Sequence, residues 1–483
     1  MSIHSGWLMP HPPLIFPEVG RGKQNEIGAT VAAFKAAAVL IAETAPETIV
    51  IISPHSVVYS DYFHISSGEG AEGDMRAFGA PGVCVRAEYD EEFVGALSRL
   101  CEDEGFPAGT LGEDEGGRER PAALDHGVAI PVRFINEAYK GAGGAVSGAS
   151  GAAEPPRYVR VGVSGLSVED HYVFGGLIAS VAERLGRKTV VIASGDLSHK
   201  LVDDGPYGYA PEGPEFDRVV CEVAEDGDFS RLFDMDAGFL EKAAECGHRP
   251  LLVMAGALDR KAVESELYSY EGPFGVGYGI ASFVVCGEDG GRTFLDDFLR
   301  AELERASERM ASESPHVELA RRTVESYVRT GRVYESPESL AEELTAGRAG
   351  VFVTIKKQGA LRGCIGTITP VTENVGEEIR ANAVSAAARD PRFPAIDEEE
   401  LPYLEYSVDV LAPAEPIMGA DELDPFRYGV IVNLGRKRGL LLPNLEGIED
   451  AETQVGIAMK KAGIAERDRS LVDLERFEVV RHR

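Results

Sequence analysis

Short runs of apolar, often β-branched residues alternate with helix-compatible stretches along the first 290 residues of the chain. Turn-forming residues bound each run, which is typical of buried strands. The predicted strands are residues 3–9, 48–53, 158–163, 189–194 and 276–286. Helix patterns at 27–44 and 172–185 lie between them. This alternation predicts an α/β domain of the α/β/α type with a central, largely buried sheet.

Three segments of this region carry no clear period and are predicted as surface loops: residues 66–79, 102–120 and 140–156. The third is rich in Gly, Ala and Ser, as flexible linkers are. Strand signals resume directly after it, so we interpret it as an insertion within the domain.

A different pattern follows the Gly-rich stretch at 287–291. It predicts charged helices, a pair of extended segments, a further helix, a strand and a hairpin. Their predicted bounds are 294–309, 317–330, 351–356, 361–369, 373–388, 404–411, 430–434 and 439–442. We therefore predict two domains, residues 1–288 and 310–483, joined by a helical segment at 289–309. The second domain is predicted to be α+β.

The charge of the chain excludes some classes of partner. Its 48 Lys and Arg against 80 Asp and Glu give a formal net charge of −32. Such a surface repels phosphate backbones and anionic lipids, so nucleic-acid and membrane binding are disfavoured. Most of the acidic excess lies in the first domain, which favours a bound cation and a neutral or amine-bearing substrate over a polycarboxylate.

Nothing at the start of the chain resembles a targeting segment, and no apolar stretch reaches the ~18 residues of a membrane helix. The six cysteines are dispersed without a CxxC pair, which favours a reduced, cytoplasmic protein over a disulfide scaffold or a structural zinc site.

Three histidines follow predicted strands: His11, His55 and His199. Open α/β sheets bind ligands beyond the carboxyl ends of their strands, so we expect these imidazoles to converge on one cleft. Imidazole is a ligand of iron, zinc, copper and nickel, and the remaining ligand decides among them.

The sequence leaves that remaining ligand open. Glu245 lies at a predicted helix break and is the preferred carboxylate. Its neighbour Cys246 offers a thiolate, which favours a softer metal. Glu271, in a loop, is the third candidate.

Two histidines and one carboxylate leave three positions open on an octahedral ion, as in the non-haem Fe(II) oxygenases. A vicinal diol and O₂ fit those positions. Ring opening then needs a base, and His199 is the candidate because imidazole titrates near neutral pH. His126 is a second candidate proton donor or oxygen-orienting group, or equally a histidine that is hydrogen-bonded at a helix entry.

Five segments together resemble the LigB-like class III extradiol ring-cleavage dioxygenases over about residues 1–288: HPPLI at 11–15, SPH at 53–55, LDHG at 124–127, ASGDLSH at 193–199 and AECG at 244–247. The resemblance implies Fe(II) held by His11, His55 and Glu245, with His199 as acid and base. The Memo-like branch of the same superfamily carries a Cys in the carboxylate region, so Glu245 and Cys246 fit both patterns.

The segment LRGCIG at 361–366 resembles the signature of the AMMECR-type domain, over about residues 310–483. The resemblance implies association with Memo-like and radical-SAM proteins, and a homodimer is a family-level expectation. From the residues alone, Cys364 is either a reactive thiol activated by Arg362 or a small buried side chain, and the second interpretation is favoured.

The resulting prediction is an Fe(II) extradiol dioxygenase, with zinc or copper as alternative metals, that opens a small aromatic diol with O₂. The alternative is a Memo-like metal-binding protein or component of a modification system without ring cleavage. A modification enzyme that uses Cys364 is the third hypothesis.

Overall fold

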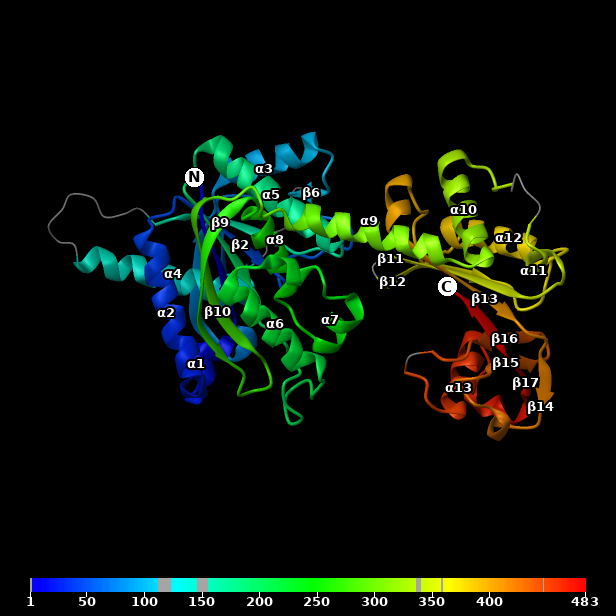
Figure 1. The fold of residues 1–483 in the computed structure, drawn as a ribbon. Coiled ribbons are helices and arrows are strands. Elements are labelled where there is room, and N and C mark those ends of the chain that lie inside the picture. The colour runs from blue at the N-terminus through cyan, green and yellow to red at the C-terminus, as the bar shows by residue number, and fades with distance from the viewer. Residues whose placement is uncertain (1, 112–122, 146–154, 336–339, 358, 446) are drawn as a thin grey trace. The chain divides into compact units, whose positions relative to one another are not determined.

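A computed structural model describes residues 2–111, 123–145, 155–335, 340–357, 359–445 and 447–483. The chain divides into two compact units, Met1–Leu299 and Arg300–Arg483, whose elements are labelled in Figure 1. Each unit has its own hydrophobic core and is described by itself.

The first unit is built on a six-stranded sheet in the order β7-β2-β8-β1-β10-β9. Its strands are β1 (Ile3–Met9), β2 (Thr48–Ser53), β7 (Arg157–Gly162), β8 (Thr189–Ser194), β9 (Lys261–Glu271) and β10 (Tyr278–Glu288). The first four are parallel to one another, whereas β10 pairs antiparallel with β1 and β9 antiparallel with β10. The predicted α/β class with a central sheet is confirmed.

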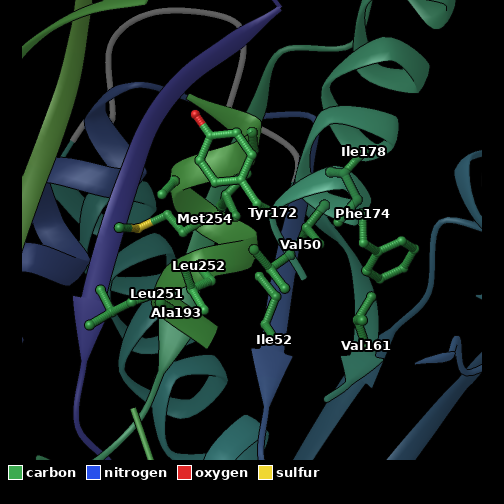
Figure 2. Close-up of a cluster of buried hydrophobic side chains, with 14 of the residues drawn as sticks. Val50, Ile52, Val161, Tyr172, Phe174, Ile178, Ala193, Leu251, Leu252 and Met254 are labelled. Carbon is green, nitrogen blue, oxygen red and sulfur yellow. The ribbon is translucent and has the colours of Figure 1, made fainter. Parts of the chain in front are cut away.

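Helices cover both faces of this sheet because alternate residues of a buried strand point to opposite sides. Val50 and Ile52 of β2 pack with α5 and α8, and Figure 2 shows this cluster. Ile49 and Ile51 of the same strand pack with α2 and α4 on the other face. The helices of the unit are α1 (Pro17–Gly20), α2 (Gly28–Glu43), α3 (Glu91–Asp103), α4 (His126–Ala145), α5 (Val168–Leu185), α6 (Glu212–Asp226), α7 (Ala237–Ala243) and α8 (His248–Ala257).

One helical stretch of the described chain, Lys23–Glu43, is long and apolar enough by composition to cross a membrane. Its side chains Phe34, Ala37 and Ile41 are buried in the core beneath the sheet. A core helix of a globular domain has this same apolar composition.

The structure corrects part of the predicted loops. Residues 66–79 contain β4 (Gly70–Met75), which forms a hairpin with β5 (Ala80–Glu88). Helix α4 continues to Ala145 where a loop was predicted, and a short strand, β6 (Ala108–Gly109), pairs with β3 (Phe63–His64). Residues 112–120 and 146–154 of the two other predicted loops lie outside the described residues.

The second unit contains two four-stranded antiparallel sheets, β12-β11-β13-β18 and β14-β17-β15-β16. Helices α10 and α12 pack on one face of the first sheet, and α13 packs on the second. The helices are α9 (Phe294–Ser312), which leads into the unit, α10 (Pro315–Thr330), α11 (Glu342–Thr345), α12 (Val375–Ala388) and α13 (Ala451–Lys461). The strands are β11 (Val351–Lys357), β12 (Ala360–Gly366), β13 (Leu404–Leu411), β14 (Glu415–Ile417), β15 (Gly429–Leu434), β16 (Lys437–Leu441), β17 (Asp473–Phe477) and β18 (Val479–His482).

Candidate metal centre

The parallel strands of the first unit carry the predicted site residues to one edge of the sheet. His11 lies two residues beyond β1, His55 two residues beyond β2, and His199 in the loop after β8. Because these three strands are parallel, their carboxyl ends meet at the same edge. His126, the first residue of α4, also lies at this edge of the sheet.

Three imidazoles form a compact cluster there. The candidate ligand atoms of His11, His55 and His126 all lie within 4.8 Å of one another. His11 Nε2 and His55 Nε2 are 3.0 Å apart, and the rings of His55 and His126 stack with centroids 4.3 Å apart. Within the described part of the chain this is the one group of at least three His, Cys, Asp or Glu side chains that is this compact.

The hydrogen bonds of His11 fix which of its nitrogens faces the cluster. Ser194 Oγ donates to the carbonyl of Gly127 at 2.6 Å, so its hydrogen is already used. His11 Nδ1, 3.0 Å from Ser194 Oγ, must therefore be the donor to that oxygen. This leaves the Nε2 lone pair directed at His55, and a proton or a cation must lie between the two nitrogens.

The spacing of the two nitrogens fits a metal ion. Two ligands bound at about 2.1 Å in octahedral or tetrahedral geometry lie about 3.0–3.4 Å apart, and the observed separation is 3.0 Å. The nitrogens of His11 and His55 therefore stand at the spacing of two ligands of a transition metal, and His126 lies within 4.8 Å as the third candidate ligand.

Burial keeps two of these imidazoles, those of His11 and His126, in the form that binds a metal. Burial and then the charge of the neighbouring His55 lower the pKa of His11 to about 3. Burial, followed by the charges of His11 and His55, also lowers the pKa of His126 to about 3. Both rings are thus neutral at neutral pH, and a neutral imidazole is a metal ligand without prior loss of a proton.

Asp125 ties together the two loops that carry His55 and His126. Its carboxylate accepts hydrogen bonds from Ser53 Oγ at 2.6 Å and Ser56 Oγ at 2.8 Å, which flank His55. It also pairs with the buried guanidinium of Arg160 at 2.9 Å. Burial by itself raises the pKa of Asp125, but Arg160 and the two hydroxyls outweigh this and hold it below its usual value. Asp125 is therefore an anionic clamp beside the cluster.

The nearest sulfur belongs to Cys246, in the turn before α8. Its Sγ lies 3.6 Å from His11 Nε2 and 4.0 Å from His199 Nε2. Burial raises the pKa of this thiol well above its ordinary value, and the charges of Asp196 and Glu245 raise it further. A bound cation reverses that preference, because a coordinating thiol is deprotonated.

The two candidate carboxylates have other partners. Glu245 Oε2 accepts from the backbone N–H of His248 at 2.6 Å, at the start of α8. Glu271 Oε2 accepts from both the backbone N–H and the hydroxyl of Thr30, each at 2.6 Å. The predicted metal role of Glu245 is not supported by these contacts, because its carboxylate caps a helix while the adjacent Cys246 faces the imidazoles.

His199 stands at the border of the cluster. Burial lowers its pKa, so the ring is neutral and can accept a proton at neutral pH. The exposed ring of Tyr207 stacks on it with centroids 5.2 Å apart. This places a proton acceptor beside the three imidazoles and next to a solvent-facing aromatic side chain.

Three supporting residues were not predicted as such from sequence: Asp125, Ser194 and Asp196. Asp196 Oδ1 accepts from the backbone N–H of His11 at 2.7 Å, and burial raises its pKa to about 6. Their position in the sequence could have identified them, because each lies in one of the motif segments and close to a strand end or a helix start.

Comparison with known proteins agrees with the two-unit organisation. Residues 5–281 match the family model of the catalytic LigB subunit of aromatic ring-opening dioxygenase, and residues 317–482 match AMMECR1. A protein of Clostridium acetobutylicum is 38% identical over 485 residues, which cover 100% of both chains. A protein of Thermotoga maritima is 50% identical over 175 residues, which are 36% of this chain and 100% of that protein.

Two solved structures are similar to parts of the chain. An uncharacterized protein from Pyrococcus horikoshii is 34% identical, covering 34% of this chain and 88% of its own, with a TM-score of 0.33. An uncharacterized protein from Escherichia coli K12 is 13% identical, covering 58% and 99%, with a TM-score of 0.35. From its family models and its full-length relative, the chain belongs to the LigB family in its first unit and to the AMMECR1 family in its second.

Proposed function

We propose that the first unit is a ring-opening dioxygenase that acts on a small aromatic diol with O₂ and uses Fe(II). The observation that carries this proposal is the cluster of His11, His55 and His126, whose ligand atoms lie within 4.8 Å of one another. Membership of the LigB family supports the reaction class. The proposed donor set is three histidines rather than two histidines and a carboxylate, with His126 as a ligand instead of Glu245.

Each residue has a separate task in this proposal. His11, His55 and His126 hold the ion, which supplies the redox chemistry that joins diol and O₂. His199 accepts a phenolic proton, since its imidazole is neutral and lies beside the cluster. Tyr207, stacked on His199, offers an aromatic surface to the ring of the diol.

The test is anaerobic reconstitution of the full chain with Fe(II), followed by a panel of catechols that includes neutral, amine-bearing and carboxylate-bearing members. O₂ uptake and a yellow ring-opened product are expected, with the carboxylate-bearing diols the poorest substrates. His55→Ala should lose both iron and turnover. His482→Ala, in the second unit, is the matched control and should keep both. Stoichiometric iron without turnover on any ortho-diol would refute the proposal.

A second candidate is favoured by one observation, the 3.6 Å separation of Cys246 Sγ and His11 Nε2. If the thiolate completes the site, the unit is a metal-binding protein for thiophilic ions without ring cleavage. Competition between Cu(I) and Fe(II) distinguishes the two. In the dioxygenase, Cys246→Ala leaves Fe(II) affinity within about twofold, whereas a loss of copper and iron binding together supports the second candidate.

A further inference from the structure

The second unit contains a cavity of about 1460 Å³, larger than the ~300–1,000 Å³ of a typical small-molecule site. Residues of both its sheets line the cavity, together with residues of α9, α10 and α13. It lies in the AMMECR1 part of the chain, to which the proposed ring opening assigns no task.

A row of polar side chains crosses the sheet on the cavity wall. Cys364 of β12 lies opposite Thr354 of β11, which in turn lies opposite Ser407 of β13. Residues directly opposite in antiparallel strands share a face, so the thiol and the two hydroxyls stand side by side. Cys364 Sγ and Thr354 Oγ1 are 3.3 Å apart.

The arginine predicted to act on this thiol, Arg362, has other partners. It pairs with Glu400 and donates to two backbone carbonyls. Asp390 accepts from the backbone N–H of Cys364 at 2.9 Å, and Arg392 donates to its carbonyl at 3.0 Å. These bonds hold the backbone of β12 at the cavity wall, and the thiol faces the interior of the cavity.

The cavity has an excess of positive charge in a chain whose formal net charge is −32. Its basic lining residues include Lys356, Arg392, Arg438, Lys461, Arg481 and Arg483. Each of its four acidic lining residues already has an arginine partner: Glu313 and Glu325 pair with Arg321, Asp409 with Arg481, and Glu405 with Arg309.

Three of the cations have no such partner. Lys356, Lys461 and Arg483 form no ion pair with any residue in the described ranges. Two buried polar atoms of the lining, Tyr406 Oη and Arg309 Nη2, also lack a hydrogen-bond partner among the described residues. Buried polar atoms without a protein partner are expected where a ligand or water completes the interactions, and the three cations are exposed and therefore accessible to the oxygen acceptors of a ligand.

Most of the remaining lining is apolar. Phe352 lies beside the polar row on β11, and Leu440 and Leu442 come from β16 and the residues after it. Such a surface takes up an aromatic or heterocyclic body, while the cations take its charged end.

We propose that this cavity binds a phosphorylated organic molecule of about nucleotide size. Its phosphates contact Lys356, Lys461 and Arg483, and its ring lies against Phe352 and the leucines of the opposite sheet. The site is separate from the metal centre and does not depend on the proposed ring opening.

The first test is calorimetric titration of the metal-free full chain, in chelator, with ADP, adenosine and inorganic pyrophosphate. ADP is expected to bind most tightly, pyrophosphate less tightly and adenosine most weakly. Lys461→Gln should weaken ADP about tenfold, the loss of one charge-assisted contact. Its neighbour Lys460 is exposed and does not line the cavity, so Lys460→Gln is the matched control and should leave the affinity unchanged.

The second test locates the ligand. Alkylation of each cysteine is followed by peptide mass spectrometry with and without ADP. ADP should slow alkylation of Cys364 at least about fivefold and leave the exposed Cys84 and Cys286 unchanged. Adenosine binding as tightly as ADP, equal ADP affinity in the two lysine variants, or no binding of ADP and pyrophosphate would each overturn the proposal.

Discussion

At the scale of single residues, the histidine cluster depends on neighbouring groups that orient its imidazoles. Ser194 sets the tautomer of His11, and Asp125 holds the loops on either side of His55 and His126. Such partners of metal ligands contribute to affinity because they restrict each ring to its binding orientation.

Asp125→Asn tests this role. The amide cannot accept from Ser53, Ser56 and Arg160 together, and it removes the negative charge that Asp125 places beside the buried guanidinium. Affinity for Fe(II) should fall about 10–100-fold, measured by competition with a chelator. The substitution Asp228→Asn, at a helix cap remote in sequence from the cluster, is the control. Unchanged iron affinity in Asp125→Asn would mean that the clamp does not position the ligands.

Asp217 gives the first unit a pH dependence. It is 1% exposed, and it accepts hydrogen bonds from the backbone N–H of Ser198 and the hydroxyl of Tyr270. Burial raises its pKa from 3.8 to about 7, so the folded state binds the proton more tightly than the unfolded state does. Stability from this group is therefore complete below about pH 4 and is lost as the pH rises to about 7.

Thermal unfolding of wild type and Asp217→Asn between pH 5 and 8 checks this sign. The wild type should lose stability relative to the variant as the pH rises across this interval. A constant difference between the two proteins over the whole interval would show that Asp217 is ionised in the folded state throughout.

At this scale the sequence predicted the histidines that come together better than it predicted their supports. His11, His55 and His199 were readable because each follows an apolar strand. The choice between Glu245 and Cys246 was not, because the two are neighbours and only the backbone decides which one faces the histidines. Ala244 adopts a left-handed φ of 52°, and the turn it makes gives the carboxylate to α8 and the thiol to the imidazoles.

At the scale of elements, close backbone approach brings the turn of Cys246 to the strand ends. A Cβ at Gly195, just after β8, would lie 2.3 Å from Gly247 Cα and 3.0 Å from Gly247 N. Neither contact can be relieved by rotation of a side chain, because both atoms belong to the backbone. Gly195 is therefore required for the turn to come this close, whereas a Cβ at Gly247 would meet Asp196 O at 3.1 Å.

Gly195→Ala should consequently destabilise the first unit by about 1–3 kcal/mol and lower its metal content. Urea unfolding and metal analysis measure the two effects. Gly290→Ala is the matched control, since a Cβ there meets nothing within 4 Å. If both variants unfold at the same urea concentration, the close approach does not constrain this turn.

Two strands that sequence patterns missed, β9 and β4, are partly exposed. β9 (Lys261–Glu271) has one buried residue and several charged ones, since it is the edge strand of the sheet. β4 (Gly70–Met75) is likewise short and rich in Gly and acidic residues. Central strands such as β2 and β8 are buried throughout and gave continuous apolar runs, so their predicted bounds agree with the structure.

At the scale of the whole molecule, two separate cores imply two unfolding events. Binding of an ion to the first unit stabilises only that unit, by about 2.7 kcal/mol at a concentration of 100 times the Kd. Calorimetry of the full chain should show two transitions, of which Fe(II) raises one and ADP the other. In His55→Ala the iron-dependent shift should vanish while the ADP-dependent shift remains. A single transition that both ligands raise would contradict independent units.

The two units also differ in how their charges are arranged. The acidic first unit suits a cation and a neutral or amine-bearing diol, whereas the second unit gathers unpaired cations in one cavity. Total charge could be read from the sequence, but this cavity could not, because its cations come from strands and helices far apart in the chain.

The most direct test of the ring-opening account is a turnover of the Fe(II)-loaded full chain with the best catechol under oxygen-18 gas. Mass spectrometry of the trapped product should find both heavy oxygen atoms incorporated into a ring-opened molecule, and none with His55→Ala. A quinone without heavy oxygen, or unchanged catechol with iron bound, would contradict the account.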